Sequence, residues 1–210
     1  MPRQYRSVLR DEQARLTRNA VVGAARNLFI ERGYSGTTID AVAERAGVSR
    51  KTVFTTVGGK AALLKVAWDW ALAGDDEPIA MADRPALREM LDQTDARMLV
   101  ASWARFVGEI AARLAPLYEV LRVAAQTDPD VAEVHATSER NRLGGARSFV
   151  QHLDEIGGLR PGLHVDRATE VAAVLMDPMP YQRLVEDADW PMEDYATLIA
   201  RMAGAAFLSE

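Results

Sequence analysis

Cysteine is absent from the 210-residue sequence, so disulfide bonds, zinc–thiolate sites and thiol catalysis are excluded. Aromatic residues make up only 7% of the chain, but hydrophobic residues reach 49%, which is enough for a sizeable core. No apolar run approaches the roughly 20 residues that span a bilayer, and the basic N-terminus lacks a hydrophobic signal region. We therefore expect a cytoplasmic protein without a membrane partner.

Positive charge is scarce overall but concentrated near the N-terminus. The whole chain has a formal net charge of −5. Residues 1–60 nevertheless hold eleven Lys or Arg against five Asp or Glu, whereas residues 61–210 hold fourteen against twenty-five. Because neutralised phosphates supply most non-specific affinity for nucleic acid, the local excess matters more than the total. The distribution indicates a basic, DNA-facing end on an acidic body.

Residues 37–60 have the pattern of two short helices joined by a tight turn. Asp40, three residues after Thr37, predicts a capping box at the start of the first helix. Gly47 can adopt the left-handed backbone that ends a helix, and Ser49 can cap the next one. This order of elements is typical of a helix-turn-helix DNA reader.

The second of these helices combines an apolar side with cationic and hydroxyl side chains. Val53 and Val57 lie four residues apart and are expected to face the core. The side chains expected to point outward, toward a DNA groove or its phosphates, are Arg50, Lys51, Thr52, Thr55 and Thr56. Thr38 and Lys60 stand at helix N-termini, where backbone amides favour phosphate.

Three stretches carry a resemblance to a known family. They are Ala-Ala-Arg-x-Leu-Phe-x-x-Arg-Gly-Tyr ending at Tyr34, Thr-Thr-Ile-x-x-Val-Ala-x-x-Ala-Gly-Val-Ser ending at Ser49, and Thr-Val-Phe-x-x-Val-Gly-x-Lys ending at Lys60. In this order they closely resemble the TetR family of bacterial transcriptional regulators, over about residues 15–70. The resemblance departs at Thr56, Val57 and Gly59, where many members have a His, an aromatic residue, and a Ser or Asp.

The resemblance adds Phe54, which matches an aromatic backbone-contact position of the family. The full set of candidate DNA-binding residues is Thr38, Ser49, Arg50, Lys51, Thr52, Phe54, Thr55, Thr56 and Lys60. The partner would be a double-stranded operator, palindromic if the protein reads it as a dimer.

The remainder of the chain shows helical periodicity and no alternation of period two, so we expect an all-α protein. Leu99, Trp103, Phe106, Ile110 and Leu114 make one apolar stripe. Pro116 is expected to begin a new helix, and Asp166 to cap another. The expected helices are 18–33, 37–46, 50–57, 60–73, 85–91, 99–114, 116–124, 130–156, 166–176 and 191–208.

By resemblance, residues 1–60 form a three-helix DNA-binding domain that a helix links to an effector-binding and dimerisation domain, residues 61–210. Dimerisation would use helices near 166–176 and 191–208. Candidate residues for an unknown small-molecule effector are Trp103, Phe106, Tyr118, Arg122, Phe149, Met176 and Tyr181. Arg122 could anchor an acidic effector, but a solvated arginine fits the pattern as well, and the aromatic residues could simply be core.

Enzymatic function has little support in the sequence. Gly58-Gly59-Lys60 lacks the earlier glycine and the following Ser or Thr of a phosphate-binding loop. The three histidines lack the spacing of a helical metal site, so neither a metal nor another cofactor is expected. We predict a non-enzymatic, effector-responsive transcriptional regulator, a repressor that leaves its operator when a small molecule binds. The alternative is a helix-turn-helix adaptor or architectural protein without an effector.

Overall fold

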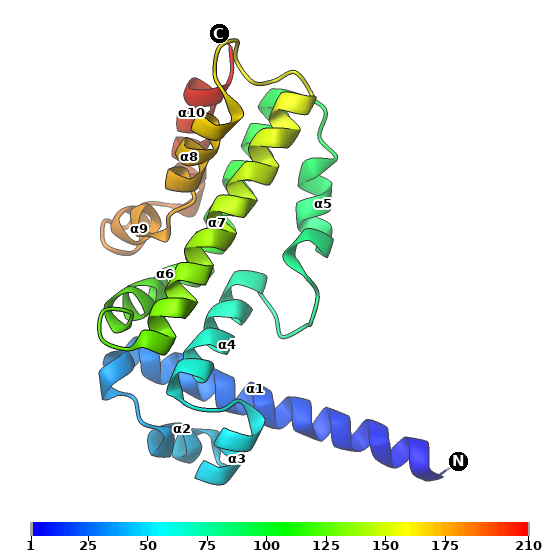
Figure 1. The fold of residues 1–210 in the computed structure, drawn as a ribbon, viewed down its shortest axis with the longest axis vertical. Helices are drawn as coiled ribbons and strands as arrows, with labels where there is room; N and C mark the ends of the chain where they lie inside the picture. Colours follow the sequence, from blue (N-terminus) through cyan, green and yellow to red (C-terminus); the bar gives the residue numbers. More distant parts are fainter. Residues whose placement is uncertain (1, 210) are drawn as a thin grey trace. The chain divides into compact units, whose positions relative to one another are not determined.

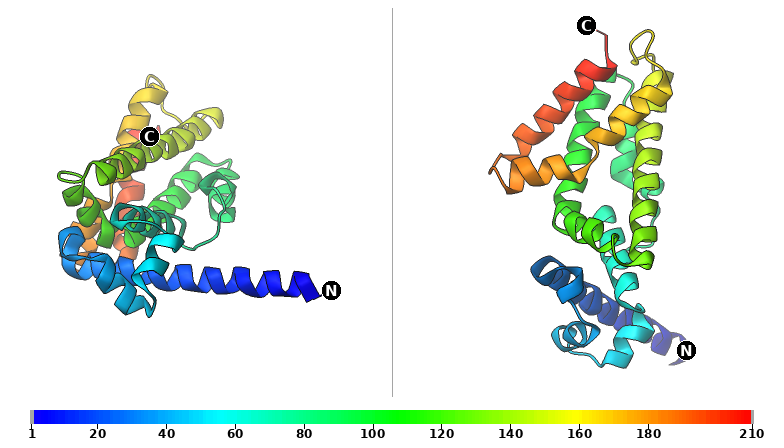
Figure 2. Two further views of the ribbon diagram at one scale, coloured as in Figure 1. Left: turned by 60° about the horizontal axis from the view of Figure 1, so that its bottom comes forward. Right: turned by 60° about the vertical axis from the view of Figure 1, so that its left-hand side comes forward.

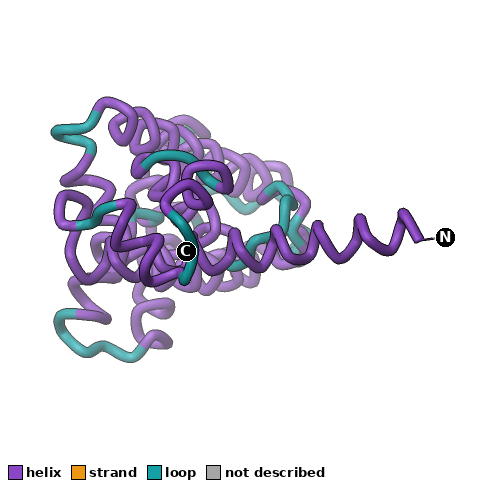
Figure 3. The backbone as a smooth tube through the Cα atoms, turned by 90° about the horizontal axis from the view of Figure 1, so that it is seen from below, coloured by secondary structure: helices purple, strands orange, loops and turns teal. Residues whose placement is uncertain are grey.

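The computed structural model describes residues 2–209, and all regular secondary structure in that range is helical (Figure 3). The predicted all-α class is therefore confirmed. The chain divides into two compact units. The N-terminal unit comprises the residues up to Asp76 together with Pro116–His135, and the C-terminal unit comprises Glu77–Ala115 and the residues from Ala136 onward. This division differs from the predicted functional domains 1–60 and 61–210, which stay a prediction.

The N-terminal unit begins with four helices (Figure 1). They are α1 (Pro2–Gly36), α2 (Ile39–Ala46), α3 (Arg50–Thr56) and α4 (Lys60–Ala73). The helix predicted over 60–73 is confirmed, whereas α1 extends well beyond its predicted start. Val21, Ala25 and Leu28 recur every three or four residues and, with Phe29, bury one face of α1, against which α2 and α4 pack. Gly33 interrupts α1 with a left-handed φ of 68°.

The predicted capping box at Thr37 is wrong, because the cap of α2 is Thr38. The Thr38 side chain accepts a hydrogen bond from the Ala41 amide at 3.1 Å. Thr37 is only 1% exposed and donates its hydroxyl to the Gly33 carbonyl at 2.8 Å. The left-handed backbone of Gly33 ends the regular ladder, which leaves its carbonyl for the hydroxyl of Thr37, four residues later.

Two long helices contribute to both units. They are α6 (Ala96–Ala124) and α7 (Pro129–Glu155), and their ends 116–135 belong to the N-terminal unit. The prediction that Pro116 starts a helix is wrong, because α6 continues through it. Proline removes one ladder hydrogen bond, but Leu114, Ala115 and Leu117 remain buried around it and stabilise the continuous helix. Asp128 caps α7 through its side chain, at the start of the helix that was expected over 130–156.

The C-terminal unit adds shorter helices to the parts of α6 and α7 that it contains (Figure 2). They are η1 (Met81–Asp83), α5 (Pro85–Leu91), α8 (Val165–Leu175), α9 (Pro178–Tyr181), the π-helical η2 (Gln182–Glu186) and α10 (Met192–Phe207). Helices α8 and α10 contact each other, as do η2 and α10. No helix within residues 2–209 is both long and apolar enough to cross a bilayer.

Asp166 was predicted to cap α8, and this prediction is wrong. His164 occupies the cap position without a side-chain hydrogen bond. Asp166 lies in the first turn, where it accepts a hydrogen bond from Arg147 of α7 at 2.5 Å. The Asp166 carboxylate, which the local sequence pattern assigned to the cap of α8, therefore forms an ion pair with another helix instead. An acidic residue in the first turn still interacts favourably with the positive end of the helix dipole.

Candidate nucleic-acid interface

The turn between α2 and α3 has the geometry that its sequence predicts. Gly47 adopts the left-handed conformation, with φ 67° and ψ 30°, and its amide donates to the last turn of α2. Val48 then donates its amide to the Ala43 carbonyl at 3.0 Å. Ser49 caps α3 by accepting from the Thr52 amide at 3.0 Å. Both helix ends are thus satisfied by the turn itself, which fixes the angle between α2 and α3.

The outward side of α3 carries the predicted cationic and apolar groups. Val53 is fully buried, whereas Arg50, Lys51 and Thr55 are exposed. Phe54 is 46% exposed, an unusual position for a large apolar ring. The Arg50 guanidinium lies 5.7 Å from the centroid of that ring. This side of α3 therefore offers charge, hydroxyl groups and one aromatic face to a partner.

Arg50 and Lys51 differ in how they are held. Arg50 donates to the Asp40 carboxylate of α2 at 2.7 Å, and both side chains are largely exposed. Within the described residues, Lys51 has no ion-pair partner. Exposed ion pairs contribute little to stability, so Asp40 can release Arg50 at small cost when phosphate is present. Lys51 can bind phosphate without first giving up an ion pair.

Two arginines hold the helices of the helix-turn-helix, α2 and α3, against α1. The sequence patterns did not reveal either contact. Arg18 donates through Nη1 to the carbonyl of Thr56 at 3.0 Å, which satisfies one free acceptor at the end of α3. Arg45 of α2 donates to Glu31 of α1 at 2.6 Å, and this bond holds the pKa of the Glu31 carboxyl below its ordinary value. These partners are 38 and 14 residues apart in the chain, beyond the reach of local pattern.

Lys60, a candidate phosphate contact, is engaged within the protein. Its Nζ donates to the Tyr34 carbonyl at 3.1 Å and lies 4.2 Å from the centroid of the Tyr34 ring. Gly59 caps α4 in an extended conformation without a side-chain bond. The amides of the first turn of α4 therefore remain the available donors at this helix end.

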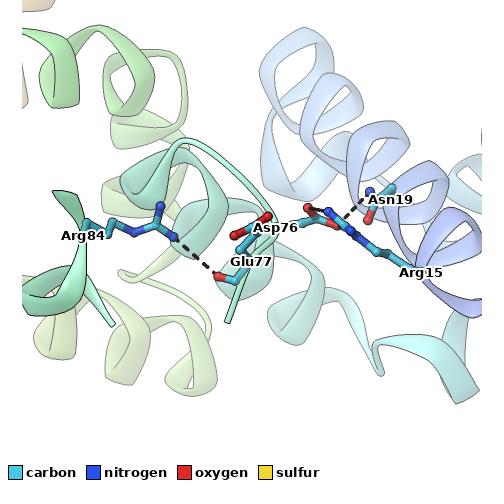
Figure 4. A network of polar contacts seen from close by, with 5 residues as sticks. All are labelled: Arg15, Asn19, Asp76, Glu77 and Arg84. Atoms are coloured by element: carbon cyan, nitrogen blue, oxygen red, sulfur yellow. Dashed lines mark hydrogen bonds and ion pairs between the residues drawn. The ribbon is translucent and has the colours of Figure 1, made fainter. Parts of the chain in front are cut away.

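A second polar cluster joins α1 to the segment that follows α4 (Figure 4). Asp76 accepts two hydrogen bonds from Arg15, at 2.6 and 2.7 Å, and one from Asn19 at 2.9 Å. Chiefly the Arg15 bond, and then the Asn19 bond, hold the pKa of Asp76 well below its ordinary value. In the C-terminal unit, Arg84 donates to the Glu77 carbonyl at 3.4 Å.

The seven candidate effector residues are divided between the two units. Trp103, Phe106, Phe149, Met176 and Tyr181 all belong to or pack against the core of the C-terminal unit. Tyr118 and Arg122 belong to the N-terminal unit. The ring centroids of Tyr118 and Trp68 lie 6.4 Å apart. Arg122 donates two hydrogen bonds to the Glu119 carboxylate, at 2.7 and 2.8 Å. The charge of Arg122 is thus already balanced within its own helix.

Trp103 and Phe149 are stacked at the centre of the C-terminal unit. Their rings are 4.3 Å apart at an angle of 12°, and each side chain is 1% exposed. Phe207 meets Phe149 edge-on at 6.0 Å. Because Trp103 and Phe149 are closely packed and buried, these two predicted effector residues contribute to the core of their unit.

Two buried hydroxyl groups in the same unit have no hydrogen-bond partner among the described residues, and neither group was a predicted ligand-binding residue. They are Tyr195 Oη on α10 and Thr169 Oγ1 on α8. Burial and the charge of Asp177 raise the pKa of Tyr195 to about 12, so it stays protonated. A buried polar group left unpaired costs about 1–3 kcal/mol, which makes both hydroxyls available to a ligand or a water molecule. The signal for Thr169 was its place among the alanines of an otherwise apolar helix face.

The last helix, which was expected to take part in dimerisation, exposes only part of its apolar surface. Tyr195 and Ile199 are buried in the core of their own unit. Met202 is exposed on α10, and Val171 and Val174 are exposed on the adjacent α8, Val174 to 67%.

Within the described part of the chain, no group of three or more His, Asp or Glu side chains could hold a metal ion.

The α2–turn–α3 arrangement coincides with a match to a known family. The family model described as bacterial regulatory proteins, tetR family, matches residues 21–67, which contain the C-terminal part of α1, all of α2 and α3, and the start of α4. The helix-turn-helix part of the chain is thus similar to that of TetR-family regulators. A relative, the HTH-type transcriptional regulator YdeS of Bacillus subtilis (strain 168), is 26% identical over 171 residues, which are 80% of this chain and 79% of YdeS.

Solved structures show that the likeness in fold extends to the C-terminal helices of this chain. FadR from Bacillus subtilis in complex with stearoyl-CoA has a TM-score of 0.68 at 14% identity, over 90% of this chain and 98% of FadR. The SmeT–triclosan complex has a TM-score of 0.66 at 22% identity, over 92% of each chain. SmeT is the repressor of the Stenotrophomonas maltophilia multidrug efflux pump SmeDEF. At these identities the likeness concerns the fold alone.

Proposed function

We propose that this chain is a TetR-family regulator, a repressor that binds a palindromic operator as a homodimer and releases it when a small molecule binds. The observation that carries the proposal is the outward side of α3. A capped helix held on α1 and α2 presents Lys51, Arg50 and Phe54 to solvent. An exposed, cationic second helix of this kind suits the major groove of duplex DNA.

Contacts to DNA would be of two kinds. Arg50, Lys51, Thr52 and Thr55 would face base edges or phosphates along α3. The amides at the N-termini of α2 and α4, next to Thr38 and Lys60, would bind phosphates. Phe54, Thr56 and Ser49 complete the proposed contact set, with Ser49 acting mainly as the cap of α3.

Dimerisation would use the exposed apolar side chains of α8 and α10. Val171, Val174 and Met202 offer a surface whose burial against a second copy is favourable, at about 25 cal/mol per Å² of apolar area. A two-fold dimer would present two copies of α3 to successive half-sites of a palindrome.

The effector would bind in the C-terminal unit. Support comes from the unpaired hydroxyls of Tyr195 and Thr169 inside an otherwise apolar interior. A ligand with an apolar body and a polar group could satisfy one of them. FadR, whose fold this chain shares, was solved with stearoyl-CoA, an amphipathic molecule of this general kind. Binding would favour one spacing of the two DNA readers over another, and so weaken operator binding.

The test is selection of duplexes from a random pool with the purified protein, followed by sequencing. We expect one palindromic site to be enriched, with its two half-sites one helical turn or a multiple of it apart. Retention of duplexes without any enriched sequence would contradict an operator-specific regulator. Thermal melting with a panel of apolar ligands then separates the two functional alternatives, because a bound effector raises the melting temperature and an adaptor without a cavity shows no shift.

A further inference from the structure

We infer that Tyr34 and Asp128 are positioning residues, which together fix the start of the DNA reader to the hairpin tip formed by α6 and α7. Both residues lie in the N-terminal unit. Tyr34 Oη donates to Asp128 Oδ2 at 2.7 Å, across 94 residues of chain. The inference rests on the proposed function, because its consequence is measured on operator binding.

Tyr34 holds the chain where it enters the reader. Its carbonyl accepts two hydrogen bonds, from the Thr37 amide at 3.2 Å and from Lys60 Nζ at 3.1 Å. The next residue, Thr38, caps α2, and Lys60 begins α4. The Tyr34 carbonyl oxygen therefore bonds both to the segment just before α2 and to the first residue of α4. A displacement of Tyr34 would move the origin of α2 and, through the capped turn at Gly47, α3 as well.

Asp128 holds the other end of this bridge. Its Oδ1 accepts from the amides of Asp130 at 3.0 Å and Val131 at 3.3 Å, and so caps α7. Its Oδ2 is the acceptor for Tyr34. The two oxygens of one carboxylate thus connect the first turn of α7 to the aromatic residue that anchors the reader. A charge-assisted hydrogen bond of this type is stronger and more directional than a neutral one.

The place of the hairpin tip in the fold gives the bridge its importance. Residues 116–135 belong to the N-terminal unit, while the rest of α6 and of α7 belongs to the C-terminal unit. Helices are stiff over several turns, so a change in either long helix reaches residues 124–131 at its end. Within the N-terminal unit, the Tyr34–Asp128 bond connects this tip to Tyr34, which lies four residues before Thr38, the cap of α2.

Two conservative substitutions test the inference. Tyr34→Phe removes only the hydroxyl, and the ring keeps its stacking on Phe29 at 5.8 Å. Asp128→Asn leaves one oxygen in place of two, so it cannot serve both Tyr34 and the amides of α7 in the same way. Asp130→Asn is the matched control, because it removes the same charge from the same helix turn without removing the acceptor of Tyr34.

The readout is the ratio of affinities for the selected palindromic duplex and for a scrambled duplex of equal length. We expect Tyr34→Phe and Asp128→Asn each to lower this ratio about tenfold, the equivalent of one charge-assisted hydrogen bond. The double variant should lose no more than the more affected single variant, because both remove one interaction. Asp130→Asn should leave the ratio unchanged.

Several results would overturn the positioning role. They are an unchanged ratio in Tyr34→Phe, losses that add in the double variant, and an equal loss in Asp130→Asn. A loss in Asp128→Asn alone would assign Asp128 to capping α7 and nothing else.

A measurement without DNA separates failure of this inference from failure of the proposed function. Hydrogen exchange of the free protein should accelerate in Tyr34→Phe at the amides of residues 37–42, and not in α10. If wild-type protein selects no operator but this acceleration is seen, the bridge stands and the proposed function fails. If selection succeeds and exchange at residues 37–42 is unchanged, the bridge fails alone.

Discussion

Each unit combines a buried apolar interior with polar bonds between residues far apart in sequence, but the two kinds of contact are placed differently with respect to the tasks proposed for the units. In the N-terminal unit, directional polar bonds join residues far apart in sequence, among them Arg15–Asp76, Arg18–Thr56 and Tyr34–Asp128. In the C-terminal unit, the centre is an apolar and aromatic cluster built around Trp103, Phe149 and Phe207.

This difference matches the tasks proposed for the two units. Directional bonds fix an orientation, which a DNA reader requires, because its side chains must meet base edges in one register. Apolar packing is non-directional and tolerates volume-conserving change, which suits a unit that must accommodate a ligand. The predictions below exploit the contrast.

The largest effect is expected from removing a central aromatic ring of the C-terminal unit. Trp103→Ala should lower the free energy of unfolding by about 3–5 kcal/mol, because the side chain is fully packed against Phe149. Urea denaturation measures the change. Trp190→Ala is the comparison, since Trp190 is 39% exposed and its loss should cost clearly less than that of Trp103. A folded Trp103→Ala protein with a loss below about 1 kcal/mol would show that the ring borders space rather than fills a core.

Acid should loosen the N-terminal unit before the C-terminal unit. Hydrogen bonds from Arg45, Arg15, Arg122 and Tyr34 lower the pKa values of Glu31, Asp76, Glu119 and Asp128, all in the N-terminal unit. A carboxyl whose folded pKa is depressed contributes stability above its unfolded pKa of about 4, and this is lost as pH falls through the folded value.

Glu186 of the C-terminal unit has the opposite shift, because burial and then the charge of Asp187 raise its pKa. Protonation of Glu186 therefore stabilises its unit as pH falls. Hydrogen exchange, corrected for intrinsic rates, should show α1–α4 opening below about pH 4 while α10 stays protected. The reverse order of opening would contradict the contrast between the two units.

A smaller effect concerns the salt dependence of DNA binding. Lys51→Ala should lower affinity for specific and scrambled duplexes alike and reduce the salt slope by about one unit per protomer. Lys60→Ala should change the slope less, because its ammonium is held by the Tyr34 carbonyl and ring. Equal slopes for wild type and Lys51→Ala would remove Lys51 from the phosphate contacts.

The smallest effect is expected at the cap of α4. Gly59 is extended, with φ −79°, and a Cβ added there would meet nothing within 4 Å. Gly59→Ser should therefore raise stability by a few tenths of a kcal/mol through a new side-chain cap. Gly58→Ser, at φ 118° and with the Ala62 side chain 3.2 Å from the added Cβ, should destabilise. Thermal melting of the pair tests both signs.

Local sequence pattern predicted those parts of the fold that local bonds determine. The bounds of α4 and α5 and the caps at Gly47 and Ser49 follow from residues within a few positions of each other. The errors at Thr37, Pro116 and Asp166 arise where a tertiary contact or the continuity of a long helix outweighs the local signal.

The exposed residues of the candidate DNA interface could be predicted from the sequence. The contacts that hold its helices in place could not. Lys60 and Tyr34 are 26 residues apart, and Tyr34 and Asp128 are 94 apart. No periodicity within a helix pairs such positions, because their proximity depends on how the helices pack. The DNA-binding and effector-binding roles of individual residues stay predictions.

Hydrogen exchange of the wild-type protein with and without its selected duplex tests most directly whether α2 and α3 form the DNA reader. The predicted result is added protection concentrated in residues 38–60, which include α2, α3 and the first turn of α4, and weakened at high salt. Protection that lies mainly outside these residues, or no protection in the presence of a retained duplex, would contradict the assignment.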